Sequence, residues 1–178
     1  MMTRYGVLAL FLTPMLLPMA QANDKTQLFE HVNQRLGWMK DVAGYKARHH
    51  QAIEDLTQES RVLSLTLNSA EGLDLQPQSV KPFITAQMDV AKAIQYRYRA
   101  DWLSMPEEKW TPLPLPVVRE KISMLSTDIL RHLAQMLKSG DRVREEDRPA
   151  FNMLISQHNI AEPDKAMLFD TLKQVSLK

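Results

Sequence analysis

The chain has 178 residues, of which 44% are hydrophobic and 24% charged, with a formal net charge of +1 and no cysteine. This length suits a single domain with a substantial core. Because the charges nearly balance, the chain lacks the basic surplus typical of nucleic-acid binding, and without disulfides its stability must come from packing.

The N-terminal segment has the pattern of a secretory signal. Arg4 precedes an apolar run over residues 7–19, and the small residues of "AQA" follow at positions 20–22. A charged start, a short hydrophobic core and a small-residue site are the three parts of such a signal. We therefore expect residues 1–22 to be a signal peptide that is cleaved after Ala22.

The alternative for this segment is a permanent membrane anchor. Pro14 and Pro18 interrupt the apolar run, which is also shorter than the roughly 20 residues that a bilayer needs. Cleavage leaves a mature domain of residues 23–178 with equal numbers of acidic and basic side chains. We expect it to be periplasmic or secreted, without membrane contact.

The next segment, residues 25–49, carries a single helical stripe. Its members recur at steps of three and four: Leu28, Val32, Arg35, Met39, Val42 and Lys46. Arg35 and Lys46 lie on this face about three turns apart, roughly 16 Å of rise. Two cations on an apolar face could clamp an anion between them, because buried charge needs a partner. Alternatively, both side chains extend past the core and keep their charges in water.

A second helix is predicted from Asp55 to Gly72. Asp55 has the position of an N-cap, and Gln58 three residues later completes a capping-box pattern before an apolar run. Gly72 is suited to end this helix.

A third helix is predicted over residues 79–102. It places Gln95 beside Ile94 on the apolar face, at the centre of the helix. A buried amide must find partners at both ends. Gln95 therefore either bridges two helices or points an N–H at a ligand.

The remaining elements complete an all-α domain of about six helices. The stretch "MPEEKWTPLPLP" at residues 105–116 is too rich in proline to be helical throughout. We interpret it as a rigid crossover, in preference to a PxxP ligand. Further helices are predicted at residues 117–139, 149–158 and 163–176.

Several motifs of known chemistry are absent from the sequence. It contains no glycine-rich phosphate loop, no CxxC pair, no HExxH and no GxSxG. His49 and His50 are adjacent, so on a helix they diverge too far to ligate one metal ion. The residues alone thus predict a helical domain that binds a small anionic ligand, without the spacing of a metal site.

Four stretches of the chain resemble a known family. "RLGWMKDVAGYK", "IEDLTQE", "GLD" and "FITAQMDVAKAIQYRYRADW" keep the spacing of the exported, all-helical chorismate mutases of the AroQ type over residues 29–102. The resemblance implies a type II chorismate mutase fold and the conversion of chorismate to prephenate. This is a rearrangement without cofactor, metal or covalent intermediate, belonging to aromatic amino acid biosynthesis but here outside the cytoplasm.

The resemblance also implies roles for six residues, which act on a substrate with two carboxylates. Arg35 would pair with one carboxylate, Lys46 would serve a carboxylate and the ether oxygen, and Gln95 would donate to the ether oxygen. Asp55 and Glu59 would lie near the hydroxyl end. Gln58 would face a carboxylate. Chorismate would be the partner, no nucleic acid is expected, and a homodimer is left open.

Two departures from the family leave the activity open. Gln58 stands where the family motif has arginine before Glu59, and our alignment places Asp128 where many members have a further arginine. Arg61 and Arg131, each one turn later, could compensate, or could be ordinary surface arginines, with Arg131 paired to Asp128. Losing a charge-assisted hydrogen bond costs about 1.5–3 kcal/mol, or roughly 10- to 100-fold in rate.

Three classes of function therefore remain. The first is an exported chorismate mutase, which could be slow. The second is a non-catalytic relative that binds an aromatic-precursor carboxylate or a protein partner. The third is a structural helical domain that has kept only the fold.

The signal interpretation predicts a defined N-terminus. Because Ala20 and Ala22 frame the cleavage site, the mature protein should begin at Asn23. Intact-mass measurement of protein recovered from the periplasm checks this, and a retained Met1 would refute it.

Overall fold

A computed structural model describes residues 18–178, with side chains from Asp24 onward. Most of the expected signal segment, including the side chains at its cleavage site, lies outside these described residues. Within the described part, no helix combines the length and the apolar character needed to span a bilayer.

The described chain is helical, as predicted, and no strand is formed between residues 18 and 178. The helices are α1 (Pro18–Gly37), α2 (Met39–Arg48), α3 (Leu56–Gly72), α4 (Pro77–Ser104), α5 (Leu115–Lys138), α6 (Arg148–Leu154) and α7 (Glu162–Leu172), with a 3-10 turn at Glu145–Asp147. The first predicted helix is interrupted at Trp38 and forms α1 and α2. The other five correspond one to one, although α6 ends four residues earlier than residue 158.

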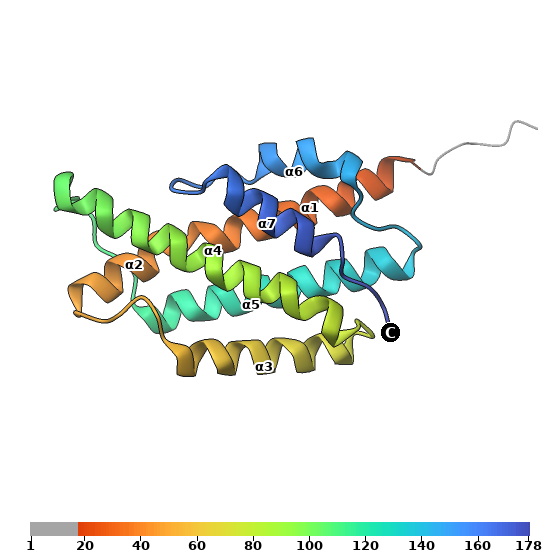
Figure 1. The fold of residues 1–178 in the computed structure, drawn as a ribbon, viewed down its shortest axis with the longest axis horizontal. Coiled ribbons are helices and arrows are strands. Elements are labelled where there is room, and N and C mark those ends of the chain that lie inside the picture. Colours follow the sequence, from red (N-terminus) through yellow and green to blue (C-terminus); the bar gives the residue numbers. More distant parts are fainter. Residues whose placement is uncertain (1–17) are drawn as a thin grey trace, which may run out of the picture.

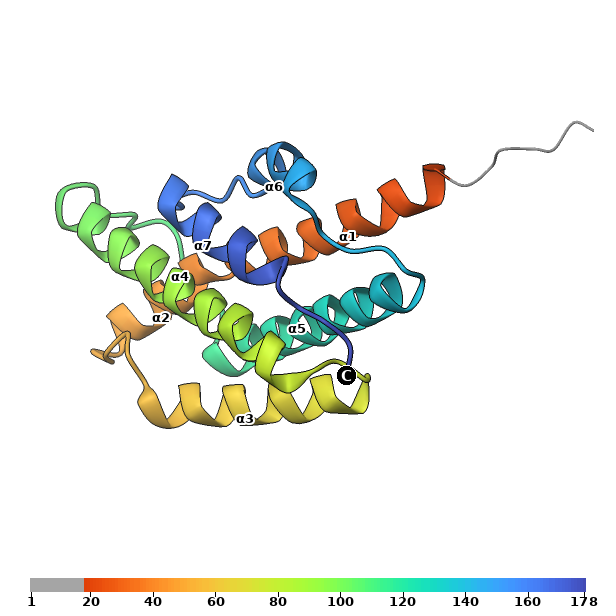
Figure 2. The same cartoon turned by 45° about the vertical axis from the view of Figure 1, so that its right-hand side comes forward.

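The helices pack around α4 and the pair α1 and α5 (Figure 1). α1 lies along α5, α2 and α3 both contact α4, and α7 packs on α4 from the other side. Turning the molecule shows α3 at its edge, against α4 and α5 (Figure 2). Only Ala70 of α3 is fully buried. α3 therefore presents one side to the bundle, and the partly buried Gln58 and Glu59 lie at its N-terminal end.

A run of aromatic rings fills the core at the α1, α6 and α7 end. Phe29, Phe151 and Phe169 are fully buried, and neighbouring ring centroids are 5.1 and 5.3 Å apart. These edge-on contacts fix α6 and α7 against α1, and large buried rings contribute more to stability than any other side chains. None of these three rings lines the polar cavity described below.

The crossover between α4 and α5 packs on α2 through Trp110. The Trp110 ring lies beside the Trp102 ring at a tilt, with centroids 5.8 Å apart, and the backbone carbonyl of Trp110 accepts a hydrogen bond from Arg48. The close approach needs a glycine in α2, because a Cβ added at Gly44 would lie 2.6 Å from the Trp110 ring. The predicted crossover is confirmed. α5 begins at Leu115, slightly earlier than predicted, with Pro114 as its N-cap.

We expect Gly44→Ala to destabilise the protein. The new methyl group must displace the Trp110 ring, and overpacking of this kind costs about 1–3 kcal/mol of unfolding free energy. Gly72→Ala is the matched control, since a Cβ at Gly72 meets nothing within 4 Å and alanine in a helix is favoured over glycine by roughly 0.5–1 kcal/mol. Urea unfolding measures both, and equal stabilities for the two variants would contradict the packing described here.

Candidate active site

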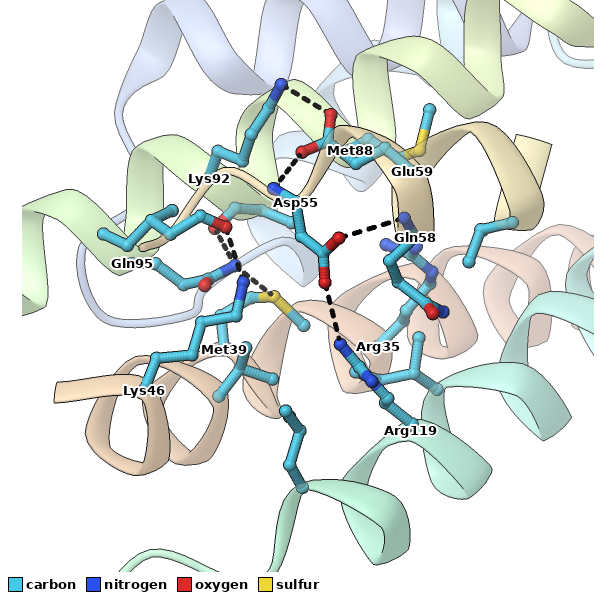
Figure 3. Close-up of a pocket in the computed structure, with 16 residues that line it drawn as sticks. Arg35, Met39, Lys46, Asp55, Gln58, Glu59, Met88, Lys92, Gln95 and Arg119 are labelled. Atoms are coloured by element: carbon cyan, nitrogen blue, oxygen red, sulfur yellow. Dashed lines mark hydrogen bonds and ion pairs between the residues drawn. The ribbon is translucent and has the colours of Figure 1, made fainter. Parts of the chain in front are cut away.

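One cavity gathers the six residues to which the family resemblance assigned roles. It is lined by α1, α2, the loop before α3, and α3, α4 and α5. Its polar lining consists of Arg35, Lys46, Asp55, Gln58, Glu59, Lys92, Gln95 and Arg119, and Figure 3 shows these side chains around one space. Apolar side chains, among them Val42, Val62 and Ile122, form the remaining walls.

Arg35 enters the cavity from α1 and is only 5% exposed. Its Nε donates to Ser126 Oγ at 3.1 Å, whereas one terminal nitrogen is buried without any hydrogen-bond partner. Burial lowers the pKa of Arg35 to about 10. The guanidinium remains charged at neutral pH and, among residues 18–178, has no carboxylate to pair with.

Lys46 enters from α2 and is 7% exposed. Its Nζ donates to the carbonyl of Ile53 at 2.5 Å. Burial lowers the pKa of Lys46, and the nearby carboxylates of Asp55 and Glu59 oppose that shift. No ion pair to Lys46 occurs within the described chain, so its two other N–H groups are available to a ligand. Neither cation extends out to solvent, which favours the clamp over the alternative.

Gln95 is buried on α4 and faces the same space. Its Nε2 donates to the Ala91 carbonyl at 3.1 Å and lies 3.6 Å from the Met39 sulfur, while its Oε1 is buried without a partner. A thioether is a weak acceptor. The N–H directed at Met39 is therefore available to a better acceptor, such as a ligand oxygen.

Asp55 caps α3, as predicted. Its Oδ1 accepts from the Gln58 backbone N–H at 3.1 Å. The reciprocal bond of the capping box comes from Glu59, whose Oε1 accepts from the Asp55 N–H at 3.2 Å, and not from Gln58 as the sequence suggested. The Gln58 amide makes no side-chain hydrogen bond within the described chain and is left to line the cavity.

Two functional candidates, Lys92 and Arg119, were missed in the sequence. Lys92 Nζ lies 3.0 Å from Glu59 Oε2, and Arg119 lies 3.3 Å from Asp55 Oδ2. Lys92 precedes Gln95 by three residues and shares its helix face, which is a signal the sequence did contain. Arg119 had no such signal, because only the packing of α5 across the cavity brings it to Asp55.

The structure contradicts the expectation that Asp128 occupies the position of a family arginine in the site. Asp128 does not line the cavity but faces a separate groove beside Gly37 and Trp38. Arg131 pairs with Asp128 at 2.6 Å, which confirms the surface alternative. Arg119, nine residues earlier, is the arginine that α5 contributes. The alignment failed because α5 has the same apolar periodicity in several registers.

Arg61 does not compensate for Gln58 inside the cavity either. It lines an adjoining groove between α3 and α5, together with Leu65 and Thr66. Residues three apart on a helix point in similar but not identical directions. Val62 and Ile122 line both the cavity and this groove, and Arg61 lines only the groove.

The charges of the cavity do not cancel. Four cations and two carboxylates line it. Lys92 pairs with Glu59 and Arg119 with Asp55, so the two positive charges left over are those of Arg35 and Lys46. Two unbalanced, buried cations on opposite sides of a partly apolar cavity form a site for a small dianion. No group of three potential metal ligands occurs among the described residues.

Comparisons with known proteins show which family the chain is similar to. The chorismate mutase type II family matches residues 25–96. The chain is 48% identical over 158 residues to a secreted chorismate mutase of Yersinia pestis, covering 89% of this chain and 85% of that protein. It is 42% identical over 144 residues to a monofunctional chorismate mutase of Enterobacter agglomerans, covering 81% and 79%.

Solved structures share the fold. The crystal structure of the Yersinia pestis secreted chorismate mutase matches with a TM-score of 0.81 and 47% identity, over 85% of this chain and 98% of that one. The chorismate mutase of Burkholderia thailandensis matches with a TM-score of 0.68 at 20% identity, over 85% and 98%.

We expect the buried Arg35 side chain to lower the free energy of unfolding. A buried cation without a carboxylate partner is unfavourable, and replacing buried charge by apolar groups of similar volume is often stabilising by about 1–4 kcal/mol. We expect Arg35→Met to raise the unfolding free energy in urea, while Arg131→Met, at an exposed ion pair, changes it by less than about 1 kcal/mol. A less stable Arg35→Met variant would show that Arg35 holds the fold together.

Proposed function

The chain belongs to the chorismate mutase type II family, and we propose that the cavity around Arg35 and Lys46 is where it rearranges chorismate to prephenate. It is a chorismate mutase, an isomerase whose reaction belongs to aromatic amino acid biosynthesis. The observation that carries the site assignment is the pair of buried cations without carboxylate partners, because chorismate supplies two carboxylates.

The reaction needs orientation and electrostatic stabilisation from the protein. One ether C–O bond breaks while one C–C bond forms within the same molecule, so no proton transfer and no nucleophile is required. Negative charge develops on the ether oxygen as that bond breaks. Positioned donors in a site shielded from water stabilise such charge, and holding the compact conformer removes much of the entropic barrier.

Each side chain has a role in this scheme. Arg35 pairs with one carboxylate, and Lys46 uses one free N–H for a carboxylate and another for the ether oxygen. Gln95 adds a second donor to the ether oxygen by turning its N–H away from Met39. Asp55 and Glu59 lie at the hydroxyl end of the substrate.

Arg119 supplies the further cation that the family pattern led us to expect on α5. In this structure it pairs with Asp55, and both side chains are 42% exposed. A half-exposed ion pair contributes only about 0–1 kcal/mol. Arg119 can therefore exchange Asp55 for a substrate carboxylate at little cost, with Gln58 as a neutral donor beside it.

Gln58 supports a second candidate, a protein that binds the dianion but turns it over slowly or not at all. A neutral amide is a weaker carboxylate partner than a bidentate guanidinium. Turnover of chorismate separates this candidate from the first, and calorimetry with a bicyclic dicarboxylate that mimics the transition state tests binding alone.

We propose that the mature domain, residues 23–178, acts in the periplasm or is secreted. The support is the signal pattern, together with the similarity to the secreted chorismate mutase of Yersinia pestis. Light scattering of the mature protein in solution tests whether it forms a homodimer.

Lys46→Ala is the direct test of the proposed site. The mature wild-type chain should consume chorismate, and the variant should lose at least about 10²-fold in turnover, the scale of losing one oxyanion donor. Its helical circular-dichroism signal should be unchanged. Lys81→Ala, at an exposed position on α4 outside the cavity, is the control. Full activity in Lys46→Ala would remove this lysine from the site.

A further inference from the structure

A chain of polar contacts crosses one side of the cavity (Figure 3). Lys92 Nζ donates to Glu59 Oε2 at 3.0 Å, and Glu59 Oε1 accepts from the Asp55 N–H at 3.2 Å. Asp55 Oδ2 then pairs with Arg119 at 3.3 Å. The contacts link α4 to α5 through the N-terminus of α3, and both oxygens of Glu59 are occupied.

Glu59 presents an electrostatic problem in a site for a dianion. Its side chain is 22% exposed and lines the cavity, so a bare carboxylate there would repel the substrate's carboxylates with little screening by water. Burial alone would raise its pKa, but hydrogen bonds from Lys92 and the Asp55 backbone, with the charge of Lys46, lower the pKa of Glu59 below its usual value. Glu59 is therefore ionised at neutral pH.

Among the residues that the structure describes, Lys92 alone forms an ion pair with this carboxylate. Lys46, on α2, is bound to the Ile53 carbonyl, and Arg119, on α5, is bound to Asp55. Arg35, on α1, donates to Ser126.

The other acidic group near Lys92 is Asp89 on its own helix, at 3.1 Å. Glu59 and Asp89 together hold the Lys92 ammonium, and these hydrogen bonds and charges raise the pKa of Lys92 despite its partial burial.

We propose that Lys92 is a positioning residue, which orients and neutralises Glu59 so that this carboxylate can face the hydroxyl end of a dianionic substrate without repelling it. The inference rests on the proposed function of the cavity. Lys92 acts through Glu59 and makes no contact with the reacting atoms. Replacing Lys92 should therefore lower the activity only while Glu59 carries a charge.

A double-mutant cycle tests this dependence. In the mature protein at pH 7.5, Lys92→Met should lower kcat/KM for chorismate at least about tenfold, mainly by raising KM, whereas in the Glu59→Gln background the same substitution should change it less than about threefold. Lys92→Arg keeps the charge and should stay within about threefold of wild type. Lys81→Met, on the same helix outside the cavity, is the matched control.

The pH dependence gives a readout that a structural role would not move. Without Lys92, the pKa of Glu59 rises, because burial remains and the hydrogen bond is lost. On acidification the Lys92→Met variant therefore protonates Glu59 at a higher pH than the wild type does, and protonation removes the repulsion. The loss caused by Lys92→Met should shrink as the pH falls, while a loss through misfolding would persist.

Two outcomes would overturn the proposal. An equal loss in both backgrounds would mean that Lys92 contacts the substrate or stabilises the fold, and a loss below about threefold in the wild-type background would mean that Glu59 does not need it. Failure of the proposed function is seen separately, as a wild-type protein that leaves chorismate unchanged. In that case the same cycle is run on binding of the bicyclic dicarboxylate by calorimetry, and absence of binding overturns both.

Discussion

The architecture of the site depends on keeping two cations, Arg35 and Lys46, out of water without giving either a carboxylate. Burial of a charge is costly unless a counter-charge arrives, and the described structure offers only Ser126 and the Ile53 carbonyl as neutral partners. The packing of α4 and α5 over the face of α1 and α2 that carries Arg35 and Lys46 therefore lowers the stability of this part of the protein. In the proposed function the substrate is the anion that removes this cost, and the stability lost by burying the two cations is regained when it binds.

The N-terminus of α3 connects this arrangement to the rest of the cavity. Asp55 caps the helix with one oxygen and holds Arg119 with the other, and Glu59 closes the cap from inside the helix. A helix that is otherwise little buried is thereby fixed at the end that lines the cavity. Local helix chemistry and active-site geometry are thus provided by the same side chains.

The sequence predicted what helical periodicity and capping control. The stripe that carries Arg35 and Lys46, the cap at Asp55 and the amide of Gln95 all lie as expected, since each depends on contacts within a few turns or on one buried face. Arg119 could not be predicted, because α5 repeats its apolar pattern in several registers and only its packing in the bundle, chiefly against α1, selects one. The break at Trp38 was missed for a related reason, since the hydrophobic stripe continues through it.

Gln58 fits the charge balance of this particular cavity. With Lys92 paired to Glu59 and Arg119 paired to Asp55, the lining already carries two unbalanced positive charges, which match the two negative charges of chorismate. An arginine at position 58, which is half-buried, would add a third, and like charges close together disfavour one another. A neutral amide at this position keeps a hydrogen-bond donor for the carboxylate without that cost. The neutral residue is therefore compatible with catalysis because other residues of the same cavity carry the charge.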